Sequence, residues 1–405
     1  MNEKNKVVFI LIDALRSDYI TKEDTPFLYE FSQKNRYCKK VTQSRSFCER
    51  AEIFTGLSPK ESGYFTAIAF SPNDSPFNGM KWLNILALFD KIIPRNRLYN
   101  AYKHRLNKFL KKQANGMSSY SIPLNILKFF NLTEDKYDFR TENGFDGQNN
   151  IFKDCKQNGL NIFYDSFTAL NFTKPSNDKL RLQELEDNIS KDYQLYLVYQ
   201  SVMDSLGHNY GPDSDEVKEG LQSLDKRLNK LYNDLISKNR DMKFIFLGDH
   251  GMTSVHTQID IEHEINIISN ENNLKLGKDY IYFLDSTIFR IWYLNDATKV
   301  LFDHKLKSNK YLLENGKFVD KDIAKKQEIP FPDRRYGDTL WMSNLGVLVF
   351  PDFFHKVKPY KGMHGYEVDD LSSKGTCMVS NGKYEYIEEI KLTDVYSIIK
   401  KELSI

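Results

Sequence analysis

The sequence has few cysteines and no long apolar run. Four cysteines are spread over 405 residues without a Cys-x-x-Cys pair: Cys38, Cys48, Cys155 and Cys377. They are too few for a disulfide scaffold and wrongly spaced for a four-thiolate zinc site. The opening MNEKNK is followed by an apolar run that ends before Asp13, whereas a secretory signal needs roughly 7–15 such residues and a membrane-spanning helix about 20. We therefore expect a soluble, cytoplasmic chain without a transmembrane segment.

A charge excess of either sign is also lacking. The chain has 57 basic and 55 acidic residues, a net charge of +2, so no nucleic-acid partner is indicated. With 40% hydrophobic and 28% charged residues, the composition excludes a disordered chain. The length allows two or three domains, or one large α/β domain with an insertion.

Short, fully apolar runs indicate strands buried on both faces of a mostly parallel sheet. These runs are Val7–Ile12, 195–199, 244–247 and 345–350. Helical patterns lie between them. Thr25 and Pro26 have the form of a helix cap followed by a first-turn proline, which predicts a helix over 27–33. Leucines at alternating spacings of four and three from Val217 to Leu235 are typical of a long crossover helix, with a coiled-coil seam as the alternative. Strands that alternate with helices predict an α/β fold.

Residues 76–160 interrupt this alternation and are expected to form an inserted, basic cap region in a domain built from 1–75 and 161–405. Between Lys81 and Lys112, nine basic residues face one acidic residue, Asp90. One helical face of this stretch is apolar through Tyr99, Tyr102, Leu106 and Phe109. Three interpretations stay open: a solvated helix, a funnel for an anionic substrate, or a contact with a membrane surface.

Four short segments carry residue types that ligate metals. Their candidate ligands are Asp13, then Asp204 with His208, then Asp249 with His250, and finally His364 on a glycine-flanked loop. The first three segments follow predicted strands, where the ligands of open α/β sheets gather. Alone, such an Asp also serves as a helix cap and such a His as a turn residue. Together the set suits two zinc ions, and two ions about 3.5–4 Å apart clamp both oxygens of an in-line phosphoryl displacement.

A nucleophile is available in the segment SRSFCERAEIFTGLSP. Ser46 precedes a predicted short helix that ends near Thr55 and Gly56. A hydroxyl at a helix N-terminus lies at the positive end of the helix dipole, which favours an alkoxide and a bound phosphate. The alternatives are that Ser46 is only a helix cap, or that the neighbouring Ser44 is the nucleophile.

In order and spacing, these motifs resemble the alkaline phosphatase superfamily, and most closely its nucleotide pyrophosphatase/type I phosphodiesterase branch. That branch carries a strand-ending Asp, a nucleophile before a TGL-P stretch, D-x-x-GH-x-x-GP, DHGM and a late HG. Here these stand as Asp13, SFCERAEIFTGLSP, DSLGHNYGP from Asp204, DHGM from Asp249, and the HG of His364. The matching segments extend from residue 7 to residue 366.

The resemblance implies a central, mostly parallel sheet flanked by helices, and two divalent metal ions, most simply Zn²⁺. One ion would be held by Asp204, His208 and His364, and the other by Asp13, Asp249 and His250. Ser46 would bind metal and attack phosphorus, forming a phosphoseryl intermediate that water hydrolyses. The implied function is hydrolysis of phosphodiester or pyrophosphate bonds in small anionic esters.

Two residues depart from the branch, which usually has Thr as nucleophile and Asn three residues later. This chain has Ser46 and Glu49, and its Arg50 falls where sulfatases carry an arginine. Glu49 and Arg50 are therefore predicted to contact substrate. They keep open a phosphomonoesterase, a sulfatase-like hydrolase or a phosphotransferase on the same scaffold. A zinc-containing binding protein without catalysis is a further alternative, and the leaving group, the pathway and the oligomeric state stay open.

Overall fold

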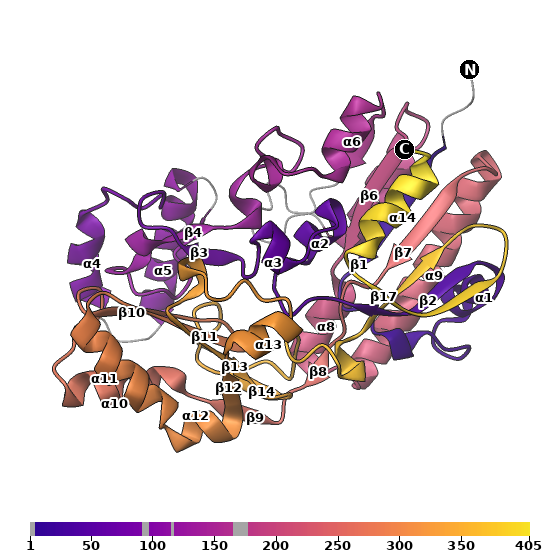
Figure 1. Cartoon of the computed structure of the whole chain (residues 1–405). Coiled ribbons are helices and arrows are strands. Elements are labelled where there is room, and N and C mark those ends of the chain that lie inside the picture. Colours follow the sequence, from indigo (N-terminus) through magenta and orange to yellow (C-terminus); the bar gives the residue numbers. More distant parts are fainter. Residues whose placement is uncertain (1–4, 91–96, 115–116, 165–176) are drawn as a thin grey trace. The chain divides into compact units, whose positions relative to one another are not determined.

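The computed structural model describes residues 5–90, 97–114, 117–164 and 177–405. The chain divides into two compact units, and each is described by itself (Figure 1). Unit 1 comprises Met1–Tyr64, Tyr137–Val255 and Tyr360–Ile405, and unit 2 comprises Phe65–Lys136 and His256–Pro359. The predicted insertion at 76–160 therefore spans parts of both units.

The centre of unit 1 is a mostly parallel sheet, as predicted. Its seven strands within the described residues have the order β17-β2-β16-β7-β1-β6-β5. Their bounds are β1 (Val7–Ile12), β2 (Arg36–Thr42), β5 (Ile162–Tyr164), β6 (Leu195–Gln200), β7 (Lys243–Leu247), β16 (Gly375–Val379) and β17 (Glu385–Lys391). β1 lies between β6 and β7 and is parallel to both, with Val8 opposite Tyr196 and Phe244. β16 runs antiparallel to its neighbours β7 and β2.

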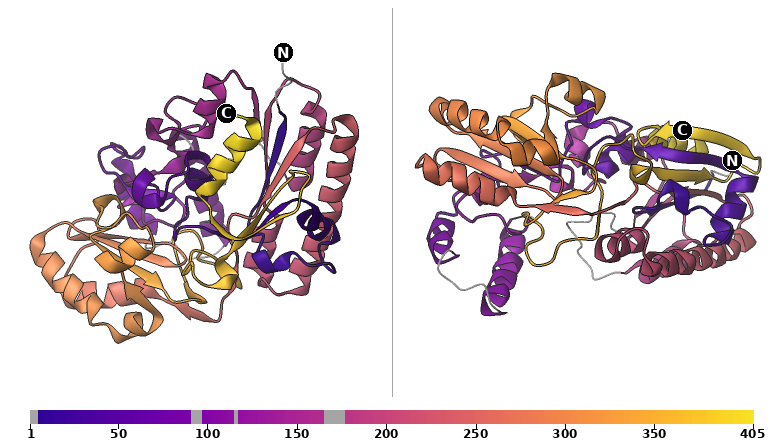
Figure 2. Two further views of the ribbon diagram at one scale, coloured as in Figure 1. Left: turned by 45° about the vertical axis from the view of Figure 1, so that its right-hand side comes forward. Right: turned by 90° about the horizontal axis from the view of Figure 1, so that it is seen from below.

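Helices cover both faces of this sheet. All six residues of β1 are buried, with Val7, Phe9 and Leu11 in one apolar cluster and the alternate residues in another. The first cluster includes residues of α2 (Glu49–Thr55), α6 (Ile151–Gln157) and α14 (Asp394–Leu403). The second includes residues of α1 (Pro26–Lys34), α7 (Asp178–Asn188), α8 (Val202–Tyr210) and α9 (Asp215–Lys238). In the left view of Figure 2, the yellow α14 and the pink α9 lie on opposite sides of the strands. Burial on both faces explains why β1 is apolar throughout.

The predicted crossover helix is α9, and its leucine stripe from Val217 to Leu235 is buried. The helix predicted after Thr25 is α1, with Thr25 at the N-cap position and Pro26 in the first turn as expected, but the Thr25 side chain makes no capping hydrogen bond. Instead the carboxylate of Asp225 in α9 accepts hydrogen bonds from the backbone amides of Phe27 (3.0 Å) and Leu28 (2.9 Å). A carboxylate supplied by another helix thus satisfies the first amides of α1.

Unit 2 is built around an antiparallel sheet with the order β10-β11-β13-β12 in its described residues. These strands are β10 (Tyr280–Leu284), β11 (Ile288–Tyr293), β12 (Gly316–Phe318) and β13 (Thr339–Ser343), and the short strands β3 (Ile68–Phe70) and β4 (Phe130–Leu132) pair separately. Its helices include α10 (Ile261–Glu271), α11 (Asp296–Lys307), α12 (Lys310–Asn315) and α13 (Lys321–Lys326). The strand predicted at 345–350 is β14 (Val347–Val349). It pairs with β9 (Thr257–Ile259) rather than joining the central sheet. An apolar run indicates burial but does not select the sheet.

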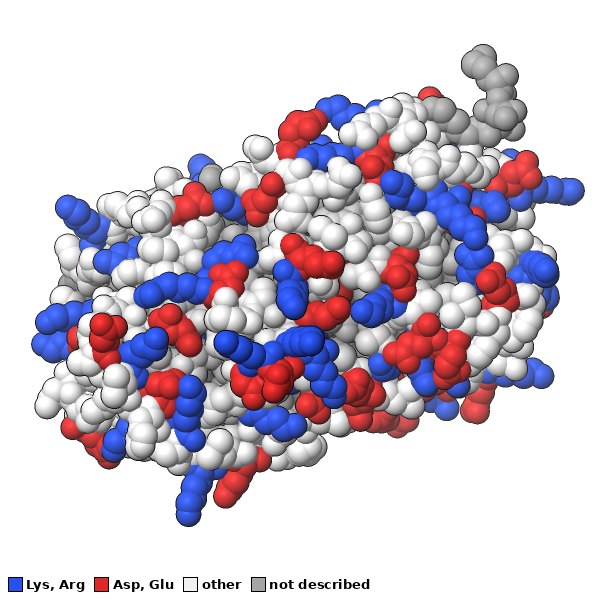
Figure 3. All heavy atoms as spheres, viewed as in Figure 1, with Lys and Arg blue, Asp and Glu red and all other residues white. Residues whose placement is uncertain are grey.

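The basic stretch contains the helices α4 (Trp82–Asp90) and α5 (Arg97–Gln113) of unit 2. Its predicted apolar face is only partly buried: Leu106 is buried, Tyr102 is half-buried, and Phe109 is 52% exposed. The side chain of Tyr99 lies outside the described residues. No helix in the described ranges is long and apolar enough to cross a membrane. Elsewhere on the face drawn in Figure 3, basic and acidic side chains are interspersed.

Candidate metal centre and active site

The candidate site lies in unit 1, where three neighbouring strands end. Asp13 follows β1, α8 follows β6, and Asp249 comes two residues after the end of β7. Since these strands are parallel and adjacent, their carboxyl ends meet at one edge of the sheet. His364 follows β15 (Gly362–Met363), which pairs with β8 (Thr253–Ser254) shortly after Asp249.

The structure brings the six predicted ligands into the two predicted groups. One group is Asp204, His208 and His364, and the other is Asp13, Asp249 and His250. Within each group the potential ligand atoms all lie within 4.8 Å of one another. Placement is therefore as expected from the motifs, while metal binding by these groups stays a prediction.

In the group around Asp13, an imidazole nitrogen faces a carboxylate. His250 Nε2 lies 3.0 Å from Asp13 Oδ1, and His250 Nδ1 lies 2.7 Å from the carbonyl oxygen of Gly251. The carbonyl can only accept, so Nδ1 carries a proton and Nε2 is the ring nitrogen that faces Asp13. Burial opposes a charge on His250, but Asp249 and Asp13 raise its pKa well above the usual value. Either a proton or a cation must therefore lie between Nε2 and Asp13.

The group around Asp204 repeats this arrangement. His208 Nδ1 lies 2.9 Å from the carbonyl oxygen of Gly362, and Nε2 lies 3.0 Å from Asp204 Oδ1. His364 Nε2 is 3.8 Å from the same carboxylate oxygen. Tyr360 stacks on His208 with ring centroids 4.3 Å apart, which holds the imidazole plane. Two imidazoles thus converge on one aspartate.

The atoms of these two groups fit a divalent cation. Asp13 Oδ1 and Asp204 Oδ1, which face imidazole nitrogens, are buried without a well-aligned hydrogen bond, as is the other ring nitrogen of His364, Nδ1. Burial, with His250 and His208 nearby, lowers the pKa of His364 well below its usual value, so this imidazole is neutral. A neutral imidazole is the form that ligates metal. Carboxylate oxygen with imidazole nitrogen is a donor set that zinc accepts.

Asp13 and Asp249 are oriented by partners that sequence reasoning missed. The Tyr199 hydroxyl donates to Asp13 Oδ2. The amides of Ala14 (3.2 Å) and His250 (3.0 Å) both donate to Asp249 Oδ1. Ala14 adopts a left-handed backbone with φ of 59°, an uncommon conformation for alanine. Burial, together with Asp13, raises the pKa of Asp249 to about 7 despite the opposing effect of His250. A divalent cation would favour the ionised form.

The glycine of the DHG motif, Gly251, is required by close packing rather than by an unusual backbone conformation, since its φ is not positive. A Cβ at this position would lie 2.0 Å from the carbonyl oxygen of Ser372. Close approach of the backbone therefore explains the glycine.

Ser46 is fully buried, and its hydroxyl is hydrogen-bonded to a carboxylate. Its hydroxyl donates to Glu52 Oε1 at 3.2 Å, while Glu52 Oε2 accepts from the Ser44 hydroxyl at 2.9 Å. Helix α2 begins at Glu49 with Cys48 at the cap position, so Ser46 is not the helix cap. Sequence reasoning missed Glu52. The available signal was an acidic residue between the apolar neighbours Ala51 and Ile53.

The residues beside Ser46 lie against the imidazoles. The Phe47 ring is 5.5 Å from the His364 ring, and the Glu49 carboxylate forms a third potential ligand group with His250 and His364. Glu49 is also among the groups that raise the pKa of His250. Arg50 is half-buried. The contacts of Glu49 and Arg50 with substrate stay predictions.

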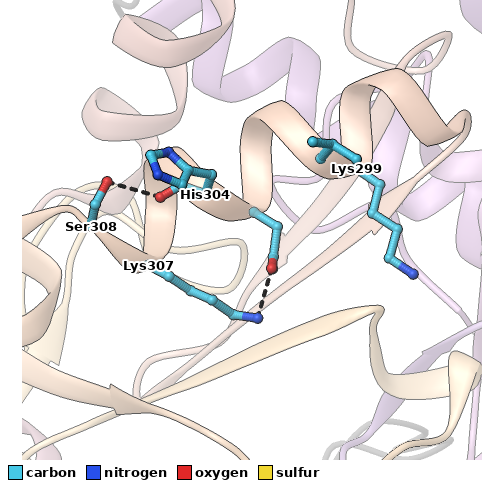
Figure 4. A pocket seen from close by; sticks show the side chains of 6 residues that line it. Lys299, His304, Lys307 and Ser308 are labelled. Carbon is cyan, nitrogen blue, oxygen red and sulfur yellow. Dashed lines mark hydrogen bonds and ion pairs between the residues drawn. The ribbon is translucent and has the colours of Figure 1, made fainter.

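A different depression lies on α11 in unit 2 (Figure 4). Its volume is about 500 Å³, and its lining includes Lys299, Asp303, His304 and Lys307. Lys307 Nζ pairs with Asp303 Oδ2 at 2.7 Å. Because this lining comes from one helix and lacks a convergent ligand group, the centre in unit 1 is the better candidate site.

Comparison with known proteins agrees with the motifs. Residues 7–367 match the family model of type I phosphodiesterase/nucleotide pyrophosphatase, and the chain belongs to this family. The predicted resemblance is thereby confirmed. Murine ectonucleotide pyrophosphatase/phosphodiesterase 5, solved as an inactive variant with AMP, has a TM-score of 0.69 and 16% identity over 99% of this chain and 96% of that chain. The human protein has a TM-score of 0.68 at 16% identity, over 99% and 95% of the two chains. These two likenesses confirm the fold.

The curated relatives match only in part. An uncharacterized pyrophosphatase/phosphodiesterase of Schizosaccharomyces pombe is 24% identical over 65% of this chain and 48% of its own length. GPI ethanolamine phosphate transferase 2 of Candida albicans is 30% identical over 24% of this chain and 12% of its own length. The matched segments thus span from about a tenth to about half of these relatives.

Proposed function

We propose that this chain is a two-metal hydrolase that cleaves phosphodiester or pyrophosphate bonds in small anionic esters. The observation that carries this proposal is the pair of ligand groups at the strand ends. Beside it stands the buried Ser46, whose hydroxyl is hydrogen-bonded to the Glu52 carboxylate. Membership of the phosphodiesterase family supports the same chemistry.

The residues that would hold the metals are Asp204, His208 and His364 at one position, and Asp13, Asp249 and His250 at the other. Zinc at both positions would neutralise charge on the phosphoryl oxygens and lower the pKa of a bound hydroxyl. The chain itself fixes the orientation of these ligand side chains. Gly251 and Gly362 carbonyls set the protonation of two imidazoles, and Tyr199 orients Asp13.

The proposed reaction has two displacements at phosphorus. Ser46 Oγ forms a bond to phosphorus as the ester bond to the leaving alcohol breaks, and the serine proton passes to Glu52. The alcohol leaves after taking a proton from solvent. Water then attacks the phosphoseryl group as the Ser46 Oγ–phosphorus bond breaks; the water releases one proton to solvent, and Ser46 recovers its proton from Glu52. Both proton transfers use the Ser46 Oγ–Glu52 Oε1 contact.

A phosphotransferase is the second candidate, and Glu49 favours it. Its carboxylate lies within 4.8 Å of ligand atoms of His250 and His364. A negative charge there repels phosphate but attracts a cationic substituent on the ester. One partial relative is an ethanolamine phosphate transferase. In this reaction an acceptor alcohol replaces water in the second displacement.

The test is turnover of matched chromogenic diester, monoester and sulfate substrates by zinc-loaded protein. We expect diester cleavage that is lost in Ser46→Ala and retained in Ser44→Ala, with zinc content unchanged in both variants. Loss in Ser44→Ala alone would identify the neighbouring serine as nucleophile. Cleavage of only the monoester or sulfate would contradict the phosphodiesterase assignment, and zinc binding without any turnover would contradict hydrolysis.

A further inference from the structure

We propose that α4 and α5 form a surface that binds lipid bilayers with anionic headgroups. The first observation is a stripe of large apolar side chains on α4. Trp82, Ile85 and Leu88 follow one another at three-residue spacing and are 38%, 60% and 63% exposed. Residues three apart lie on one face of a helix. An exposed apolar stripe of this kind marks an interaction site.

Helix α5 extends this stripe into a patch. Phe109 is 52% exposed, and its ring centroid lies 6.1 Å from that of Trp82. Figure 1 and the right view of Figure 2 both show α4 and α5 as neighbours in unit 2. The apolar side chains of two helices therefore meet on one surface, which we call the α4–α5 patch.

Basic residues edge the patch. Arg105, Lys108 and Lys112 of α5 are exposed and lie within four residues of Phe109. The surrounding stretch from Lys81 to Lys112 has nine basic residues and one acidic residue. Apolar side chains bordered by cations are the pattern of a helix that lies in the interface of an anionic bilayer. Tryptophan, with tyrosine, is enriched at that interface.

The charge of the patch favours a bilayer over a second copy of this chain. Two copies would bring Arg105 and Lys108 against an equally basic surface, and like charges repel. An anionic bilayer accepts the apolar side chains and neutralises the cations at the same time. The proposed contact is peripheral, with the apolar side chains of the patch entering the interfacial region of the bilayer. This inference does not depend on the proposed hydrolase activity.

Tryptophan fluorescence of the full chain gives a local readout. Of the three tryptophans, Trp292 and Trp341 are fully buried and Trp82 is exposed. We expect vesicles of equal parts phosphatidylcholine and phosphatidylglycerol to shift the emission of Trp82 to the blue, and pure phosphatidylcholine vesicles to have little effect. The shift should be lost in Trp82→Phe, although that variant still sediments with the anionic vesicles.

Paired variants separate the two contributions. Ile85→Ser with Leu88→Ser should remove vesicle binding by lowering apolar insertion. Arg105→Glu with Lys108→Glu should weaken binding at least about 25-fold, since each basic residue near an anionic surface contributes about fivefold. Val300→Ser with Val357→Ser is the matched control, because both valines are exposed in unit 2, at 74% and 87%. Thermal melting confirms that each variant is folded.

Three results would overturn the proposal. The first is that the wild-type chain does not bind anionic vesicles at low salt. The second is that binding is unchanged in the apolar pair or in the charge pair, which would place the contact elsewhere. The third is lipid-free self-association that the apolar pair abolishes, because the patch would then join two copies of this chain.

Discussion

At the scale of single residues, buried polar side chains of unit 1 are held by specific hydrogen-bond partners. Glu52 shows this most clearly, because one oxygen accepts from Ser46 and the other from the hydroxyl and amide of Ser44. Glu52 is 1% exposed, so this carboxylate is held in one arrangement. It fixes the direction of the Ser46 hydroxyl and can take its proton.

Glu52→Gln should lower kcat without loss of metal. Glutamine keeps the size of the side chain but cannot take the serine proton, and removing a general base typically costs about a hundredfold or more. We expect part of the rate to return at alkaline pH, where serine ionises without help. The measurement is the pH profile of kcat beside zinc content, with the exposed Glu30→Gln as control. An unchanged profile would contradict the role of Glu52.

At the scale of elements, helix ends are satisfied by residues far away in the sequence. The amides of Phe27 and Leu28 at the start of α1 donate to Asp225 of α9. Burial raises the pKa of this carboxyl, with the two amides opposing the shift. The contact joins α1 to the crossover helix on one face of the sheet.

Asp225→Ala should lower the free energy of unfolding by about 2 kcal/mol, because two amides lose a buried acceptor. Asp225→Asn should cost less, since the amide oxygen still accepts. Urea denaturation measures both, and Glu219→Ala on the exposed face of α9 is the control. Equal stability of the wild type and Asp225→Ala would show that Thr25 or water replaces the cap.

At the scale of the whole molecule, the two units bury charge differently. Unit 1 gathers carboxylates and imidazoles at its sheet edge. Unit 2 buries an ion pair in which Arg290 donates to Asp285 at 2.9 Å, with Arg290 also donating to the carbonyl oxygen of Ile68. Burial raises the pKa of Asp285 to about 6, with Arg290 opposing and Asp352 adding to the shift.

Asp285 should make stability fall as the pH rises. Its pKa is 3.8 when unfolded and about 6 when folded, so between these values the native state binds more protons. Wild-type protein should therefore lose up to about 3 kcal/mol relative to Asp285→Asn as the pH rises from about 4 to about 7. Urea unfolding of both proteins across this range is the measurement. Parallel curves would show that Asp285 is ionised throughout.

The net charge of the molecule conceals an uneven distribution. The stretch from Lys81 to Lys112 carries nine basic residues and one acidic residue, or +8, so the rest of a chain with net charge +2 carries −6. The proposed binding of the α4–α5 patch to an anionic bilayer depends on that local excess of positive charge. Its apolar members Ile85 and Leu88 entered no sequence prediction, and only their exposure in the structure distinguishes them from core residues. The cytoplasmic location stays a prediction.

The sequence by itself determined three adjacent strands of the main sheet, β1, β6 and β7, and the ligand set. A strand such as Val7–Ile12 is apolar because both faces are covered, and Asp13, Asp204 and Asp249 follow strands whose ends must meet in a parallel sheet. Only the tertiary structure decided which groups complete the site and the elements. Glu52 beside Ser46, Tyr199 on Asp13 and β14 in unit 2 are such cases. These choices depend on contacts made only after folding. For Glu52 the sequence offered only an acidic residue between apolar neighbours, and for the other two no local spacing in the chain records the contact.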